Sequence, residues 1–125
     1  MNLQSWWIAA RPKTLIVSIA PVLLGLALSL NNHFFSSLVV GLLTLIAAIL
    51  IQLGTNFIND LYDFLSGADD EYRLGPTRVV QAGLLSEQQI KLGALFCFMS
   101  SLLIGVYLVF IGGTPILLIG SFALI

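Results

Sequence analysis

Charged side chains are scarce in this sequence, with five Lys or Arg and six Asp or Glu among 125 residues and a formal net charge of −1. So few cations cannot form a basic surface, and a nucleic-acid partner is therefore not expected. Cysteine is scarcer still, and the single Cys97 excludes an internal disulfide framework or a cysteine-based zinc site. Apolar residues make up 58% of the chain, and the mean hydropathy is +1.03. That composition is typical of a polytopic protein embedded in a lipid bilayer.

The apolar residues fall into long runs bounded by turn-forming or charged residues. These runs predict an all-α polytopic transmembrane helical bundle, because about 20 apolar residues in a helix cross a bilayer. We expect spans at about 14–30, 36–63 and 88–111, the start of a fourth span at 115–125, and a loop at about 64–86. A loop of that length and charge is more typical of a functional lid than of a simple connector.

Several local signals accompany the predicted spans. Ser86 followed by Gln89 has the pattern of an N-cap and capping box at the start of the third span. Within that span, Gly93 and Gly105 would allow close packing against other helices. Pro21 lies inside the first span and predicts a kink there.

The basic residues predict an orientation. They are Arg11 and Lys13 before the first span, and Arg73, Arg78 and Lys91 in or beside the 64–86 loop. Two spans separate these groups, so both lie on the same side, which the positive-inside rule makes cytoplasmic. Trp6 and Trp7 read as interfacial anchors on that side. We therefore expect a multi-pass protein of the cell inner or plasma membrane, with its N-terminus and the 64–86 loop in the cytoplasm.

Acidic residues gather where the second span meets the loop, and five of the six lie between positions 60 and 71. They follow a polar stripe on a helix that is otherwise largely apolar. With about 100° between successive residues, the stripe occupies an arc of about 80 to 100°. Its members are Gln52, Asn56, Asn59, Asp60 and Asp63.

An Asp near the bilayer centre costs roughly 2.5–3.5 kcal/mol, and intramembrane acids usually mark function. The stripe is therefore expected to face a cavity or a partner helix. The alternative is that this end of the helix simply emerges into water.

Carboxylate and amide oxygens one helical turn apart suit a hard divalent cation. Mg²⁺ prefers oxygen ligands and is typically held by one or two carboxylates together with water and substrate phosphates. The stripe thus points to a diphosphate-bearing substrate.

Three motifs occur together in this chain. They are Arg11-Pro12-Lys13-Thr14-Leu15, then Asn59-Asp60-x-x-Asp63 with Gly67-x-Asp69, then Arg73-Leu74-Gly75-Pro76-Thr77-Arg78-Val79-Val80-Gln81-Ala82-Gly83. In combination they resemble the UbiA-type intramembrane aromatic prenyltransferases, and the resemblance covers essentially the whole chain. Within that family the resemblance is strongest to the branch that prenylates 1,4-dihydroxy-2-naphthoate in the menaquinone pathway.

The resemblance implies a larger helical bundle around a central cavity, with two aspartate-rich motifs that bind Mg²⁺ and a polyprenyl diphosphate. Asn59 and Asp63 match the first two positions of the family's Asn-x-x-x-Asp-x-x-x-Asp motif, whereas its third position is Gly67 here. The missing acid is carried over to Asp69. The second motif belongs to the later half of such enzymes, so the chain is expected to be the N-terminal portion of one.

The roles that follow from this reading are those of a prenyltransferase site. Asp60 and Asp63 are the predicted catalytic acids, and the predicted Mg²⁺ ligands are Asn59, Asp63 and Asp69. The predicted diphosphate-binding cations are Arg73, Arg78 and Lys91, while Gln52 and Asn56 complete the polar stripe. Apolar spans would hold the isoprenoid tail.

Other functions stay open at this point. A different aromatic acceptor, such as 4-hydroxybenzoate, would suit the same motifs. A non-enzymatic cation pathway lined by Asp60 and Asp63 is a second alternative, although such sites usually lie near the membrane midplane between broken helices. A purely structural helix-packing module is the third, and it leaves the Gly75-Pro76-Thr77-Arg78 sequence unexplained.

Overall fold

The computed structural model describes residues 2–29, 34–67 and 77–123, with the side chains of 34–37 and 123 excepted. The described residues form five helices, and no strand occurs among them. The helices are α1 (Leu3–Ala10), α2 (Pro12–Ser29), α3 (Phe34–Leu65), α4 (Glu87–Gly112) and α5 (Thr114–Ala123). The all-α prediction is confirmed.

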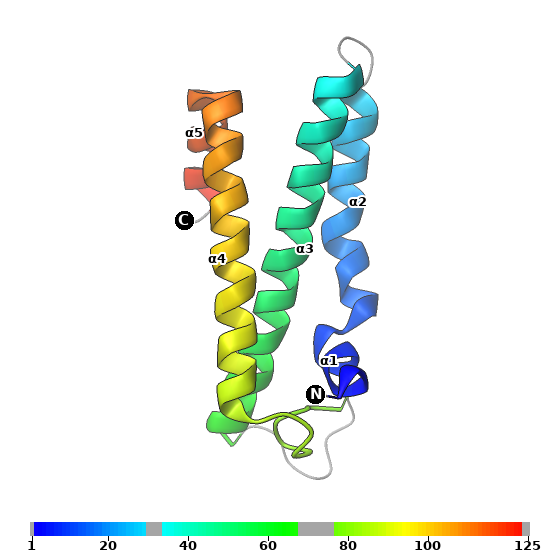
Figure 1. Ribbon diagram of the computed structural model, residues 1–125, viewed down its shortest axis with the longest axis vertical. Coiled ribbons are helices and arrows are strands. Elements are labelled where there is room, and N and C mark those ends of the chain that lie inside the picture. The colour runs from blue at the N-terminus through cyan, green and yellow to red at the C-terminus, as the bar shows by residue number, and fades with distance from the viewer. Residues whose placement is uncertain (1, 30–33, 68–76, 124–125) are drawn as a thin grey trace.

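Three of the described helices, α2, α3 and α4, are long and apolar enough to cross a membrane. α3 is the central element: it packs against α2 on one side and α4 on the other, and the short α1 also contacts it (Figure 1). α5 turns back against the far end of α4 (Figure 1). The N-terminus and the 77–86 segment lie at the same end of the bundle (Figure 1). The molecule is therefore a multi-pass helical membrane protein with one end closed by α1 and a loop.

Local signals account for several helix ends. The Ser86 hydroxyl accepts a hydrogen bond from the Gln89 N–H, and the Gln89 side chain accepts one from the Ser86 N–H, so the predicted capping box is confirmed. α2 begins at Pro12, where a missing N–H costs nothing, and it continues through Pro21 as one helix. α4 is followed by its C-cap Gly113, whose φ of 69° suits a residue without a Cβ.

The buried core lies at the end of the bundle near the N-terminus. It draws on α1, α3, α4 and the loop before α4, whereas α2 contributes no fully buried residue. Its members are Ala9, Phe57, Leu61, Val79, Val80, Leu85, Ile90, Ala94 and Cys97. Much of the remaining apolar surface is exposed along the helices, as expected where the surrounding medium is lipid.

Trp6, predicted to be an interfacial anchor, is partly buried and packs against this core. Its ring packs edge-on against Phe57, with centroids 5.5 Å apart and planes at 72°. A Cβ added at Gly93 would lie 2.8 Å from the same ring. The absence of a side chain at Gly93 therefore lets Trp6 lie between α3 and α4. Trp7 is exposed, as an anchor would be.

The two glycines predicted to allow close packing differ in what surrounds them. Gly93 meets Trp6 as described, and Gly54 on α3 similarly accommodates the ring of Phe98, which would lie 2.9 Å from an added Cβ. A Cβ at Gly105 would meet nothing within 4 Å among the described residues. Close packing in this part of the chain therefore depends on Gly54 and Gly93.

Candidate active site at the end of α3

The inner part of the polar stripe faces the junction between α1 and α2. Asn56 is buried, and its side-chain amide donates to the Ala10 carbonyl oxygen at 2.8 Å and to the Thr14 hydroxyl at 2.9 Å. One turn earlier, Gln52 donates to the Asn56 side-chain oxygen at 3.2 Å. These bonds offset the cost of placing amides inside an apolar bundle. Gln52 and Asn56 thus fasten α3 to the chain around residue 10.

Asp60 continues the same face and is 2% exposed. Its Oδ1 accepts from Arg11 Nη2 at 3.2 Å and lies 3.6 Å from Arg78 Nη1. Its Oδ2 accepts from the backbone N–H groups of Val79 at 2.9 Å and Val80 at 3.4 Å. A buried carboxylate is tolerated only when it is paired and hydrogen-bonded, and these contacts satisfy both requirements.

Arg11 reaches Asp60 from a strained backbone position. It caps the C-terminus of α1 with φ 49° and ψ 67°, the one positive φ found at a described residue other than glycine. Its N–H donates to the Ile8 carbonyl oxygen at 3.2 Å, and Pro12 begins α2 directly afterwards. Left-handed backbone is unfavourable for a residue with a Cβ unless its surroundings hold it there. The ion pair with Asp60 is one contact that does so.

The segment after residue 77 forms a compact turn. Ala82 N–H donates to the Arg78 carbonyl oxygen at 3.0 Å, and Leu84 N–H donates to that of Val79 at 2.9 Å. Val79 is fully buried, and Gly83 adopts φ 67°. As at a helix start, the first N–H groups of such a turn point away from its own carbonyls and need another acceptor. Asp60 Oδ2 is that acceptor.

Asn59 and Asp63 form the outer edge of the stripe. Successive residues in a helix project about 100° apart, so Asn59 and Asp60 lie at opposite edges of the stripe. Asn59 is exposed, and the side chain of Asp63, one turn further on, is 33% exposed. Arg78 Nη2 pairs with Asp63 Oδ2, so one guanidinium bridges Asp60 and Asp63.

The other predicted site residues are placed as follows. Lys91 is exposed on the first turns of α4 and pairs with Glu87 at 3.4 Å. Asp69 and Arg73 lie outside the described residues. The structure therefore brings together Asp60, Asp63 and Arg78, with Asn59 beside them.

The oxygen atoms of Asn59 and Asp63 fit a Mg²⁺ site in which the substrate supplies some of the ligands. Within 2–29, 34–67 and 77–123 there is no cluster of three or more His, Cys, Asp or Glu side chains. Asn59 carries an amide and is exposed, and Asp63, one turn further along α3, carries a carboxylate and keeps 33% of its side chain exposed. One carboxylate with water and diphosphate oxygens is an ordinary Mg²⁺ environment in proteins.

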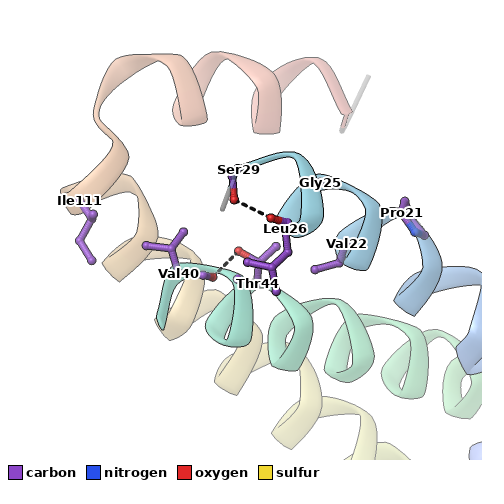
Figure 2. A pocket seen from close by; sticks show the side chains of 9 residues that line it. Pro21, Val22, Gly25, Leu26, Ser29, Val40, Thr44 and Ile111 are labelled. Atoms are coloured by element: carbon purple, nitrogen blue, oxygen red, sulfur yellow. Dashed lines mark hydrogen bonds between the residues drawn. The ribbon is translucent and has the colours of Figure 1, made fainter. Parts of the chain in front are cut away.

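A hollow of about 630 Å³ lies at the other end of the bundle (Figure 2). It is bounded mostly by α2 and α3, and its polar groups are few: Ser29 and Thr44 bond to carbonyl oxygens of their own helices. Its lining consists of Pro21, Val22, Gly25, Leu26, Ser29, Val40, Gly41, Thr44 and Ile111. With a rise of about 1.5 Å per residue, Thr44 and Asp60 are roughly 24 Å apart along α3. The hollow is thus an apolar space remote from the charged site.

Sequence reasoning used Arg11 as a charged flank and as part of the first motif, but gave it no role in the site. The available signal was its position directly before Pro12. A proline often begins a helix, so the chain is expected to change direction at Arg11. The backbone N–H groups of Val79 and Val80 were also missed, since no side-chain pattern identifies them.

The fold and the charged site define a multi-pass helical membrane protein with acids, an amide and two arginines gathered at one end of its central helix. The chain belongs to the UbiA prenyltransferase family, whose family model matches residues 18–125.

The chain is similar to proteins named 1,4-dihydroxy-2-naphthoate octaprenyltransferase. The relative from Haemophilus influenzae is 40% identical over 110 residues, which cover 86% of this chain and 35% of the relative. The relative from Escherichia coli is 40% identical over 88 residues, covering 70% and 28% respectively. One from Bacillus subtilis is 34% identical over 106 residues, covering 84% and 33%. The chain thus spans about a third of the length of these curated relatives. No solved structure matches it significantly.

Proposed function

We propose that this chain forms the first aspartate-rich half-site of an enzyme that transfers a polyprenyl group from a prenyl diphosphate to an aromatic acceptor. Family membership supports the reaction class. The acceptor we propose is 1,4-dihydroxy-2-naphthoate, as in menaquinone biosynthesis, because several relatives are named for that substrate. The same names make 4-hydroxybenzoate the weaker alternative.

One observation carries the proposal: the loop before α4 folds back so that Arg78 meets Asp63, with Asn59 on the adjacent turn of α3. Asn59 and Asp63 would hold Mg²⁺, and Asp69 is the further ligand we propose. When bound, Mg²⁺ supplies Lewis-acid stabilisation of the diphosphate leaving group. Arg78 binds diphosphate oxygens and stabilises the charge that develops on them as the allylic C–O bond breaks. Arg73 and Lys91 are proposed to add to that positive field.

The remaining surfaces fit the same reaction. The apolar faces of the spans, including the hollow between α2 and α3, offer space for the isoprenoid tail. We place the N-terminus and the loop before α4 in the cytoplasm, on the basis of the positive-inside rule. A cation pathway is less well supported, because the guanidinium groups of Arg11 and Arg78 beside Asp60 would repel a passing cation.

The proposal is tested in membranes that contain the protein expressed from its own gene. Octaprenyl diphosphate, 1,4-dihydroxy-2-naphthoate and Mg²⁺ should yield the prenylated product. Asp63→Asn should lower turnover by about 100-fold or more, the scale seen when one electrostatic stabiliser is removed. Asn59→Ala should lower it substantially.

Tyr62→Phe is the matched control, because Tyr62 is the neighbour of Asp63 and is 68% exposed. It should keep wild-type turnover. Full activity of the Asp63→Asn variant would exclude this half-site.

A further inference from the structure

The contacts of Asp60 distinguish it from the other acid at this site. Both of its oxygens are occupied by the described parts of the chain: Oδ1 by Arg11 and Arg78, and Oδ2 by the N–H groups of Val79 and Val80. An ionised carboxylate offers about four lone-pair directions. Three hydrogen bonds and the ion pair with Arg78 at 3.6 Å therefore surround its two oxygens, whereas Asp63 keeps a third of its side chain exposed.

We infer that Asp60 is a positioning residue, which locks the turn at 78–83 and the α1–α2 junction onto α3 and so holds Arg78 beside Asp63. This inference rests on the proposed function, because it assigns Asp60 a role in the same site. It replaces the prediction that Asp60 acts directly in catalysis.

The first step of the argument concerns the turn. Val79 and Val80 are buried at 0% and 7% exposure, so their N–H groups have no ready access to water. Asp60 Oδ2 accepts both at once, as a capping side chain does at the start of a helix. Because the acceptor comes from another helix, the bond fixes where the turn sits on α3 as well as its local shape.

The second step concerns Arg78. Its side chain is 8% exposed and its guanidinium spans Asp60 Oδ1 and Asp63 Oδ2. Since Asp60 also anchors the backbone directly after Arg78, the arginine is held at its head group and its main chain by the same acid. A guanidinium held in this way is ready for a ligand next to Asp63 without first being ordered.

The third step concerns Arg11. Its side chain is 18% exposed and shares Oδ1 with Arg78. Two guanidinium groups near one another repel unless an anion lies between them. Removing the charge of Asp60 should therefore release Arg11, whose left-handed backbone joins α1 to α2, and loosen Arg78, which keeps its ion pair with Asp63.

The test uses hydrogen exchange of the complete protein in lipid nanodiscs, read on peptides that cover residues 77–85. Asp60→Asn should speed exchange of this segment by about tenfold or more, the factor expected when charge-assisted hydrogen bonds are lost. Asn59→Ala, the adjacent position on the exposed edge, should leave its exchange unchanged.

Arg11→Gln serves as a second variant in case Asp60→Asn fails to insert. Arg11 reaches the turn through Asp60, so its loss should also speed exchange at 77–85, by a smaller factor. The two changes together should have less than the sum of their separate effects, because they act through one carboxylate.

Kinetics separate positioning from metal binding. Asp60→Asn should raise the KM for prenyl diphosphate several-fold, while the Mg²⁺ concentration that gives half-maximal activity stays unchanged. Asp63→Asn should shift that Mg²⁺ requirement.

Wild-type exchange at 77–85 in an inserted Asp60 or Arg11 variant would overturn the inference. So would a shift in the Mg²⁺ requirement for Asp60→Asn equal to that for Asp63→Asn. The exchange measurement needs no turnover, so the absence of prenyl transfer in the wild type would reject the proposed function and leave the exchange result to decide the role of Asp60.

Discussion

Asn59 and Asp60 are adjacent on α3, yet they differ in exposure and in their contacts. Asn59 is exposed, while Asp60 is 2% exposed and bonded to two other segments. The cause is the rotation of about 100° between them, which turns one side chain outward and the other toward α1 and the loop. In a motif of this kind, neighbouring polar residues therefore have different tasks.

At this scale we predict the effect of Arg78→Lys. Lysine keeps the charge and thus the topology signal, but it cannot bridge two acids or bind a diphosphate in bidentate geometry. The KM for prenyl diphosphate should rise by about tenfold, consistent with the loss of one charge-assisted hydrogen bond. Steady-state kinetics with varied prenyl diphosphate measure this.

Arg73→Lys, at a position outside the described residues, should have a weaker effect of the same kind. If both lysine variants keep wild-type kinetics, and only removal of the charge disturbs membrane orientation, these residues are orientation signals alone.

Among the elements, α3 and α4 approach each other closely because each has a glycine at a point of contact. Gly54 receives the ring of Phe98, and Gly93 receives that of Trp6. The buried core lies next to the site, because its members Phe57 and Leu61 flank Asp60 on α3. Helix packing at this end therefore determines where the charged residues meet.

Gly93→Ala should destabilise the protein by about 1–3 kcal/mol, the usual cost of overpacking a filled region. The added methyl would lie 2.8 Å from the Trp6 ring, so the ring must shift. Gly105→Ala is the matched change on the same helix, where the new Cβ meets nothing within 4 Å among the described residues. It should be neutral or stabilising, since alanine favours helix over glycine. Thermal unfolding in detergent compares the two, and equal Tm values would contradict the packing argument.

For the whole molecule, the charged groups of the α1–α2 junction, the end of α3 and the loop before α4 gather at one end of the bundle (Figure 1). The helix ends at Gly112 and Thr114 lie at the other. Our proposal that the basic residues lie on the cytoplasmic side, as the positive-inside rule predicts, also predicts which exposed positions face outward.

Single cysteines at Gln4, Ala82 and Thr114, each exposed, test the orientation in a Cys97→Ala background. A membrane-impermeant thiol reagent applied to intact cells should label Thr114→Cys and spare Gln4→Cys and Ala82→Cys. Opening the cells should make all three reactive. Labelling of Ala82→Cys in intact cells would show that the orientation is the opposite of the one proposed.

The sequence by itself determined those features that depend on neighbours along the chain. Helical periodicity placed Gln52, Asn56, Asn59, Asp60 and Asp63 within one arc, and the spacing of Ser86 and Gln89 identified a capping box, because both arise within a few residues of one helix. The apolar runs likewise predicted three helices long and apolar enough to cross a membrane, since most side chains of such a helix face either lipid or other apolar side chains.

Only the tertiary structure decided how the polar arc is divided. Arg11 and Asp60 are 49 positions apart, and Asn56 meets Ala10 across 46, so neither contact leaves a local pattern. The packing of Trp6 against the core could not be predicted for the same reason: it depends on a glycine of α4 that is far away in the chain. Asp60 became an internal anchor and Asp63 stayed partly open because α1 and the loop pack against one side of α3, and that choice is made by packing between helices.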